Sequence, residues 1–213
     1  MQPEHKIQFQ GTAGLIEGKH RLAENNQLGL LMCHPHPLFQ GSMDNKVVTT
    51  ATRAAAELGL PTVRFNFRGV GNSQGVHDAG VGEKEDVLTA IAYATQELGW
   101  QKVVLAGFSF GSGMACLAAC EQPEDINTLI LIAPPVHNFD APNQLAYSFE
   151  TYVFMGDADE VVSFNEVHDW VRTVVPTPHL QVFEGASHFF HGRLTELKDA
   201  IQHALQPAMQ NKG

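Results

Sequence analysis

A short glycine-flanked turn in the middle of the chain most constrains how this sequence can fold. Its residues are G-F-S-F-G at 107–111, with Ser109 at the centre; the turn follows the apolar run 103–106 and precedes a helix-like stretch at 112–120. Glycines at both ends lack the Cβ atoms that would clash with a neighbouring strand and helix. The turn therefore holds the serine in a strained conformation at a strand end, beside N–H groups that open a helix.

Apolar strand-like runs alternate with amphipathic helical patterns along the rest of the chain. After a hairpin at 7–22, the predicted strands are 28–33, 61–67, 102–106, 129–132, 151–155 and 180–183, and the predicted helices are 44–58, 83–98, 112–120, 164–174 and 193–205. Such alternation predicts right-handed βαβ crossovers and an α/β fold, with a mostly parallel sheet flanked by helices on both faces. Ligands bind such sheets at the carboxyl ends of the strands, where the serine also lies.

Length and charge narrow the class of protein. The 213 residues suit one domain over 1–213, large enough for a sizeable core. The formal net charge of −10 argues against nucleic acid and against anionic membranes as partners, because both require a cationic surface.

The termini and the cysteines carry information about location. Residues 1–6 have no apolar stretch of the kind found in signal peptides, and no run in the chain is long enough to span a bilayer. The three cysteines, Cys33, Cys116 and Cys120, are too few for a disulfide framework and are expected to be buried thiols. A cytoplasmic location with no membrane contact is predicted.

Two later segments supply partners for the serine. A serine hydroxyl is a weak nucleophile until a histidine takes its proton, and that imidazole needs an acid to orient it. The segment G-D-A-D-E at 156–160 offers two aspartates, and G-A-S-H-F-F-H at 185–191 offers two histidines. Each segment follows a predicted strand, in the chain order serine, acid, histidine of the α/β-hydrolase arrangement.

These motifs resemble those of the α/β-hydrolase superfamily, and within it the small, lidless, dienelactone-hydrolase-like serine esterases. The resemblance extends over 28–197. It implies a nucleophile elbow at Ser109, with His188 as base and Asp159, three residues after the turn glycine, as acid. Asp157 then structures its turn, and His191 is the alternative base. The matching blocks are C-H-P-H-P-L-F at 33–39, D-N-K at 44–46, F-N-F-R-G-V-G-N-S at 65–73, 107–111, 156–162 and S-H-F-F at 187–190.

An oxyanion hole requires two N–H donors. One is predicted to be the backbone N–H of Phe110, directly after the nucleophile. The other is expected from the loop 34–39, whose two prolines have no N–H to donate. Leu38 is the predicted second donor, and His36 and Phe39 are the alternatives.

Two rival hypotheses compete with serine hydrolysis. His34 and His36 lie two residues apart after a strand and, with His188, His191 and a carboxylate, are a candidate Zn²⁺ site of a metal hydrolase. Hydrogen bonding that supports the loop is the preferred interpretation of this pair, because a metal site leaves the glycine-flanked serine unexplained. A catalytically silent scaffold used for binding is the second rival, since a fold alone does not fix function.

The sequence thus predicts a serine hydrolase that forms an acyl-enzyme, most simply a carboxylesterase acting on small short-chain esters or thioesters. No cofactor is needed, and the expected partner is a small-molecule acyl substrate; a homodimer through surface helices is compatible with the chain. Residues 133–150 leave too little room for a substantial cap between two strands. An open, shallow site for short acyl groups, without interfacial activation, is therefore expected.

Overall fold

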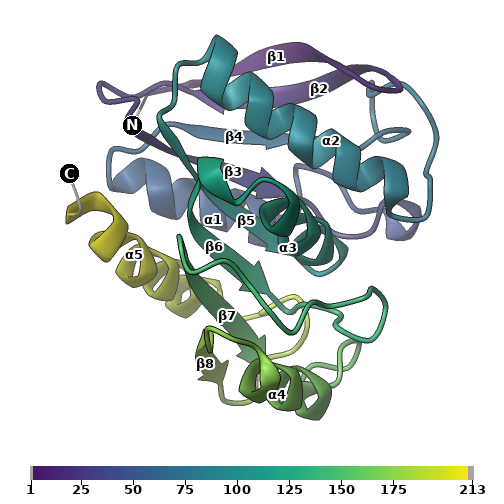
Figure 1. The fold of residues 1–213 in the computed structure, drawn as a ribbon, viewed down its shortest axis with the longest axis vertical. Helices are drawn as coiled ribbons and strands as arrows, with labels where there is room; N and C mark the ends of the chain where they lie inside the picture. Colours follow the sequence, from purple (N-terminus) through teal and green to yellow (C-terminus); the bar gives the residue numbers. More distant parts are fainter. Residues whose placement is uncertain (1, 211–213) are drawn as a thin grey trace.

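One twisted sheet organises the molecule in the computed structural model, which describes residues 2–210 (Figure 1). Its strand order is β1-β2-β4-β3-β5-β6-β7-β8. The predicted hairpin is antiparallel and joins β4 in antiparallel register, whereas β3 to β8 run parallel. The strands are β1 (Glu4–Gly11), β2 (Gly14–Arg21), β3 (Leu28–Cys33), β4 (Thr62–Phe65), β5 (Lys102–Phe108), β6 (Ile126–Ile132), β7 (Glu150–Gly156) and β8 (His179–Phe183).

The order of the strands decides which face each helix covers. From β3 to β4 the chain steps toward the hairpin, and from β4 onward it steps the other way. Right-handed crossovers therefore place α1 on one face and α2, α3 and α4 on the other. The last helix returns to pack beside α1, so both faces are covered (Figure 1). The helices are α1 (Lys46–Glu57), α2 (Val81–Ala92), α3 (Phe110–Glu121), α4 (Phe164–Thr173) and α5 (Leu194–Gln210).

Continuous burial explains why the parallel strands have unbroken apolar runs. All six residues of β3 are buried, as are six of the seven in β5, because helices cover both faces of the sheet. Helix α1 begins two residues later than predicted because Asn45 is its N-cap. The Asn45 Oδ1 accepts the Val47 N–H at 2.8 Å, which satisfies one of the donors left free at a helix start.

The reversal of chain direction beside β3 creates the place where a site can form. Loops after β3 and β5 leave their strands in opposite directions and open a crevice at the carboxyl edge. The segment 133–149 between β6 and β7 contains no helix. The prediction of an α/β-hydrolase fold without a substantial cap is thus confirmed.

The structure also locates the three cysteines and shows the length and polarity of the helices. Cys33 and Cys116 are buried as predicted, but Cys120 is exposed because it lies in the last turn of α3. Within residues 2–210, every helix is too short or too polar to cross a bilayer.

Candidate active site

The strained serine stands where β5 meets α3. Ser109 has φ 53° and ψ −123°, a backbone conformation that few non-glycine residues adopt, and its N–H donates to the Ile132 carbonyl at 2.8 Å. A Cβ at Gly107 would collide with the Gly111 backbone, and one at Gly111 would collide with the carbonyl of His34. Gly107 therefore allows the turn to close on itself, and Gly111 allows it to lie close to the end of β3.

Three side chains predicted from separate segments meet at this turn. The His188 Nε2 lies 3.1 Å from the Ser109 Oγ, and its Nδ1 lies 2.8 Å from the Asp159 Oδ2. The other carboxylate oxygen of Asp159 accepts the N–H groups of Val161 and Val162, each at 2.8 Å. With its carboxylate thus fixed, Asp159 keeps the proton of the imidazole on Nδ1 and leaves the Nε2 lone pair facing the serine hydroxyl.

The acidic segment after β7 makes two further contacts with the loop after β8. Asp157, the alternative acid, accepts the Gly185 N–H at 2.6 Å and so structures the turn. Glu160 accepts the backbone N–H of His188 at 3.1 Å, a role that sequence reasoning missed. The alternative base, His191, is exposed.

Removing the Glu160 carboxylate is expected to loosen the histidine without removing any reacting group. Glu160→Ala should lower kcat for an ester substrate about three- to tenfold at unchanged KM, because one hydrogen bond contributes about 0.5–1.5 kcal/mol. Glu160→Gln keeps an acceptor oxygen and should stay within about twofold of wild type. Steady-state kinetics of both variants check this, and an alanine variant with wild-type kcat would contradict it.

The loop after β3 lies against the residue that follows the serine. The ring of His36 lies 4.7 Å from that of Phe110. The Leu38 N–H donates to the His36 Nδ1 at 3.2 Å, and the Phe39 N–H donates to the His36 carbonyl at 3.1 Å. Among residues 2–210, the backbone N–H groups of His36 and Phe110 have no hydrogen-bond partner. The role of Leu38 as second oxyanion donor stays a prediction. It requires the Leu38 N–H to break its hydrogen bond with the His36 imidazole.

His34 supports this loop from inside the protein. It is fully buried; its Nδ1 lies 2.6 Å from the Pro35 carbonyl, and its Nε2 accepts the Phe67 N–H at 3.0 Å. Burial lowers the pKa of His34 to about 4. Both ring nitrogens are thus engaged within the protein, as the hydrogen-bonding interpretation expects. In the described part of the chain, no three His, Cys, Asp or Glu side chains are grouped as metal ligands.

The lowered pKa of His34 makes the fold sensitive to acid. Between an ordinary pKa of 6.5 and the folded value of about 4, the unfolded chain binds a proton that the folded chain does not. The free energy of unfolding should therefore fall by about 3 kcal/mol as the pH decreases from 6.5 to 4, and should level off below pH 4. Urea unfolding of wild type and His34→Gln at pH 7 and pH 4 isolates this contribution, because other groups are common to both. Equal pH dependence in the two proteins would contradict it.

Comparison with known proteins decides the family. Residues 41–156 match the model of a family described as the alpha/beta hydrolase fold. The chain belongs to the alpha/beta hydrolase family. An uncharacterized protein of Rickettsia prowazekii (strain Madrid E) is 36% identical over 216 residues, covering 97% of this chain and 90% of the relative.

Two solved structures are similar over almost the whole of this hydrolase. An alpha-beta serine hydrolase homologue from Coxiella burnetii is 41% identical, with a TM-score of 0.87, and the match covers 96% of this chain and 98% of the other. A serine hydrolase without a lid from Xanthomonas campestris is 36% identical, with a TM-score of 0.89, covering 96% and 94%. The suspected membership among lidless α/β serine hydrolases is confirmed.

A second histidine–carboxylate pair in this alpha/beta hydrolase lies beside the site. The His77 Nδ1 lies 2.8 Å from Oε1 of Glu83, which is fully buried. The other oxygen of Glu83 accepts the Gly80 N–H at 2.8 Å. The His77 ring lies 5.1 Å from that of His36 and 5.9 Å from that of Phe110. Through the hydrogen bonds that it accepts from the N–H groups of Asp78 and Gly80, Glu83 fixes the loop that enters α2. No sequence motif indicated the proximity of His77 and Glu83.

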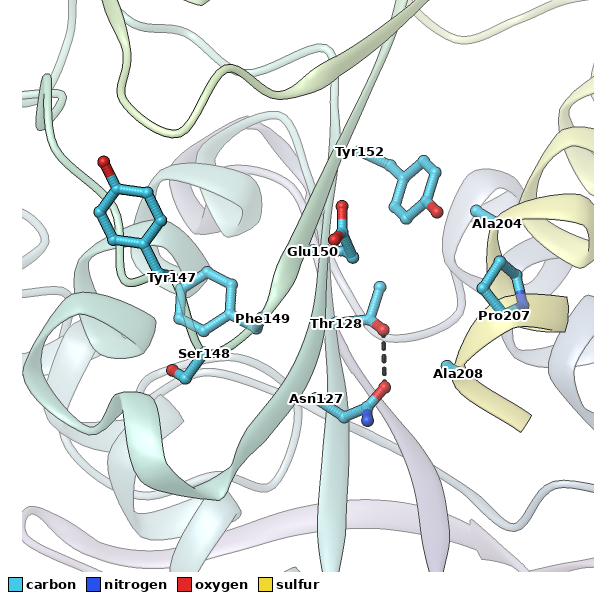
Figure 2. A pocket seen from close by; sticks show the side chains of 10 residues that line it. All are labelled: Asn127, Thr128, Tyr147, Ser148, Phe149, Glu150, Tyr152, Ala204, Pro207 and Ala208. Carbon is cyan, nitrogen blue, oxygen red and sulfur yellow. Dashed lines mark hydrogen bonds between the residues drawn. The ribbon is translucent and has the colours of Figure 1, made fainter. Parts of the chain in front are cut away.

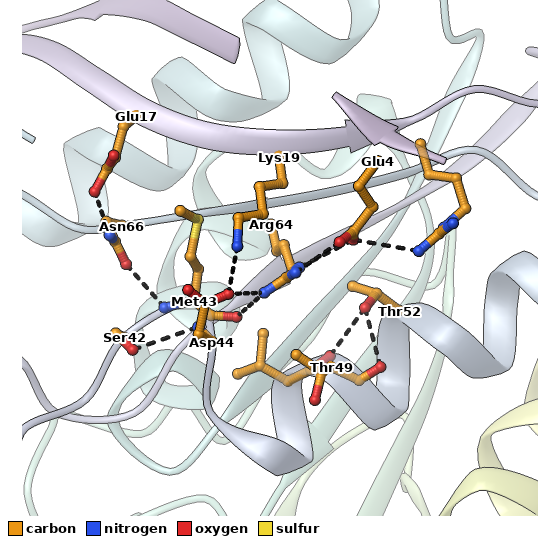
Figure 3. A network of polar contacts seen from close by, with 12 residues as sticks. Glu4, Glu17, Lys19, Ser42, Met43, Asp44, Thr49, Thr52, Arg64 and Asn66 are labelled. Carbon is orange, nitrogen blue, oxygen red and sulfur yellow. Dashed lines mark hydrogen bonds and ion pairs between the residues drawn. The ribbon is translucent and has the colours of Figure 1, made fainter. Parts of the chain in front are cut away.

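A polar network ties the amino-terminal hairpin of the hydrolase to the loop that precedes α1 (Figure 3). Arg64 is buried and binds Glu4 at 2.7 Å, while its other nitrogen contacts Asp44 at 2.5 Å. The hydrogen bond from Arg64 lowers the pKa of Glu4. Asn66 donates to Glu17 at 2.7 Å and accepts the Met43 N–H at 2.8 Å. The network holds the far end of the loop that begins at His34.

One cavity of the hydrolase is too remote to take part in the chemistry. It has a volume of about 170 Å³ and lies beside the first residues of β6 and β7 and the end of α5 (Figure 2). Ser109, Asp159 and His188 stand at or after the carboxyl ends of parallel strands. The cavity therefore belongs to the opposite edge of the sheet.

Proposed function

We propose that this protein is a serine hydrolase that cleaves small carboxylic esters or thioesters through an acyl-enzyme. The proposal is carried by the hydrogen-bonded series from Ser109 through His188 to Asp159, with contacts of 3.1 and 2.8 Å. A nucleophile, a base within hydrogen-bond reach and an oriented acid are what acyl transfer by serine requires.

The proposed reaction assigns a role to each group of the site. The Ser109 Oγ attacks the substrate carbonyl while His188 Nε2 takes its proton, and Asp159 stabilises the resulting imidazolium. The N–H of Phe110 and a second N–H from the loop after β3 hold the oxyanion. When the tetrahedral adduct collapses, His188 returns the proton to the leaving group. Water activated by the same imidazole then releases the acid.

The loop after β3 offers two candidates, His36 and Leu38, for the second N–H donor of the oxyanion hole. Its Leu38 N–H is occupied by the His36 imidazole, whereas the His36 N–H is unbonded among the described residues. Of the alternatives that the sequence left open, His36 therefore needs the smallest change to serve. Leu38, with its side chain 67% exposed, serves only if it exchanges its partner for the oxyanion.

The absence of a helix between β6 and β7 supports the choice of small substrates. With only the irregular segment 133–149 at this position, no helical cap covers the serine. We propose an open site that hydrolyses short-chain substrates dissolved in water. A rate that rises steeply for acyl chains beyond about eight carbons would argue for a deep apolar site instead.

Labelling with a fluorophosphonate tests the proposal directly. Intact mass of wild type should increase by one adduct, and Ser109→Ala under the same conditions should remain unmodified. Failure of the folded wild-type protein to react would contradict an activated serine and would favour the binding scaffold.

A further inference from the structure

A cavity of about 400 Å³ adjoins the residue that follows the proposed nucleophile. Phe110, Met114 and Leu117 of α3 form one wall, and Phe139 of the segment 133–149 forms another. The beginning of α2 closes it from the third side. Its size falls within the range of small-molecule sites, about 300–1,000 Å³.

Two glycines help to keep this space open. At Gly113 a Cβ would lie 2.9 Å from the Phe139 ring, so the ring packs close to the backbone of α3 only because glycine is there. Gly80 has φ +94° and a Cβ there would lie 3.3 Å from the Met114 methyl group. Larger residues at either position would push a wall of the cavity inward.

The position of the cavity indicates which half of an ester it faces. A leaving group has to lie near the Nε2 of His188, which returns a proton to it. The cavity is lined by residues 79–84, 110–117 and 135–140, and by none of the segment 156–192 that carries Asp159 and His188. The cavity therefore borders Phe110, next to the proposed nucleophile, and lies away from the segment that would face the leaving group.

We infer that this cavity binds the acyl group of the substrate, an inference that rests on the proposed serine hydrolase function. Its aromatic and aliphatic walls suit a neutral apolar chain of about six carbons, or a ring of that size. The mouth disfavours a terminal carboxylate, because Lys84 is already paired with Glu121 and lies 3.7 Å from Glu85, and Asp140 adds a negative charge.

The relative rates on two esters with one leaving group test the inference. Wild type should show a kcat/KM for p-nitrophenyl hexanoate at least tenfold above that for the acetate. Leu117→Trp narrows the cavity from α3, and Asn138→Trp narrows it from the exposed segment, where a large side chain does not disturb the core. Each should reduce the hexanoate-to-acetate ratio at least fivefold.

Leu22→Trp is the matched control, because Leu22 is exposed beyond the end of β2 and does not line the cavity. It should leave the ratio within twofold of wild type. Variants that hydrolyse the acetate but keep the wild-type ratio would overturn the acyl site alone, as would a wild type that prefers acetate. If wild type cleaves neither ester, the proposed function fails and the acyl site with it.

Discussion

Ser109→Ala should lower kcat on p-nitrophenyl acetate by about 10⁴- to 10⁶-fold, to the level at which only binding and oxyanion stabilisation remain. Among residues 2–210, the Ser109 hydroxyl is the one side-chain nucleophile that contacts the His188 Nε2, so no neighbouring side chain is placed to replace it. The thermal midpoint of the Ser109→Ala variant should stay within about 2 °C of that of wild type. Alanine keeps the Cβ, and the turn is fixed by the backbone and by Gly107 and Gly111.

A serine at the opposite edge of the sheet provides the control for this variant. Ser148 is exposed and lines the remote cavity beside β7, so Ser148→Ala should retain full activity. Initial rates measured beside circular dichroism melts separate a lost nucleophile from a lost fold. Residual activity of Ser109→Ala above about 1% of wild type would show that hydrolysis takes another route.

Asp159→Asn should reduce kcat by about 10⁴-fold, because it imposes the wrong tautomer on the histidine. The N–H groups of Val161 and Val162 require an acceptor and will hold the amide oxygen where the Asp159 Oδ1 now lies. The amide NH₂ then faces the imidazole Nδ1 and donates to it. The imidazole proton is displaced to Nε2, which no longer accepts from the serine.

The matched variant Asp157→Asn distinguishes the two acids of the same turn. Asp157 contacts the Gly185 backbone, and its amide analogue keeps an oxygen for that N–H. We expect a loss of less than tenfold in kcat. Comparable losses in the two variants would show that the turn as a whole, rather than the carboxylate bound to His188, determines the rate.

The elements that the sequence predicted well depend on local chemistry. The elbow follows from two glycines around Ser109, and the buried strands follow from apolar runs that only a sheet covered on both faces requires. Strand β6 was predicted three residues too short because Asn127 and Thr128 interrupt its apolar pattern. Thr128 is nonetheless buried, and the sheet pairing extends through it.

What the sequence did not reveal depends on contacts between distant segments. In the sequence, Glu160 cannot be distinguished from any other surface glutamate. Only the return of the chain after β8 brings the His188 N–H to its carboxylate. The pairing of His77 with Glu83 likewise depends on how the loop enters α2. Which N–H of the loop after β3 is free depends on the rotamer of His36, a property that no residue pattern encodes.

Nucleophile and base stand on unequal supports. Ser109 follows β5, which lies in the middle of the sheet, whereas His188 follows β8, an edge strand with one of five residues buried. Edge segments open at a lower free-energy cost than the strands of a core. The acids of 157–160 tether the loop after β8 to the better buried β7. Beside its packing against Phe108, the histidine therefore depends on a few exchangeable polar contacts, and loss of these contacts would remove the chemistry while the fold persists.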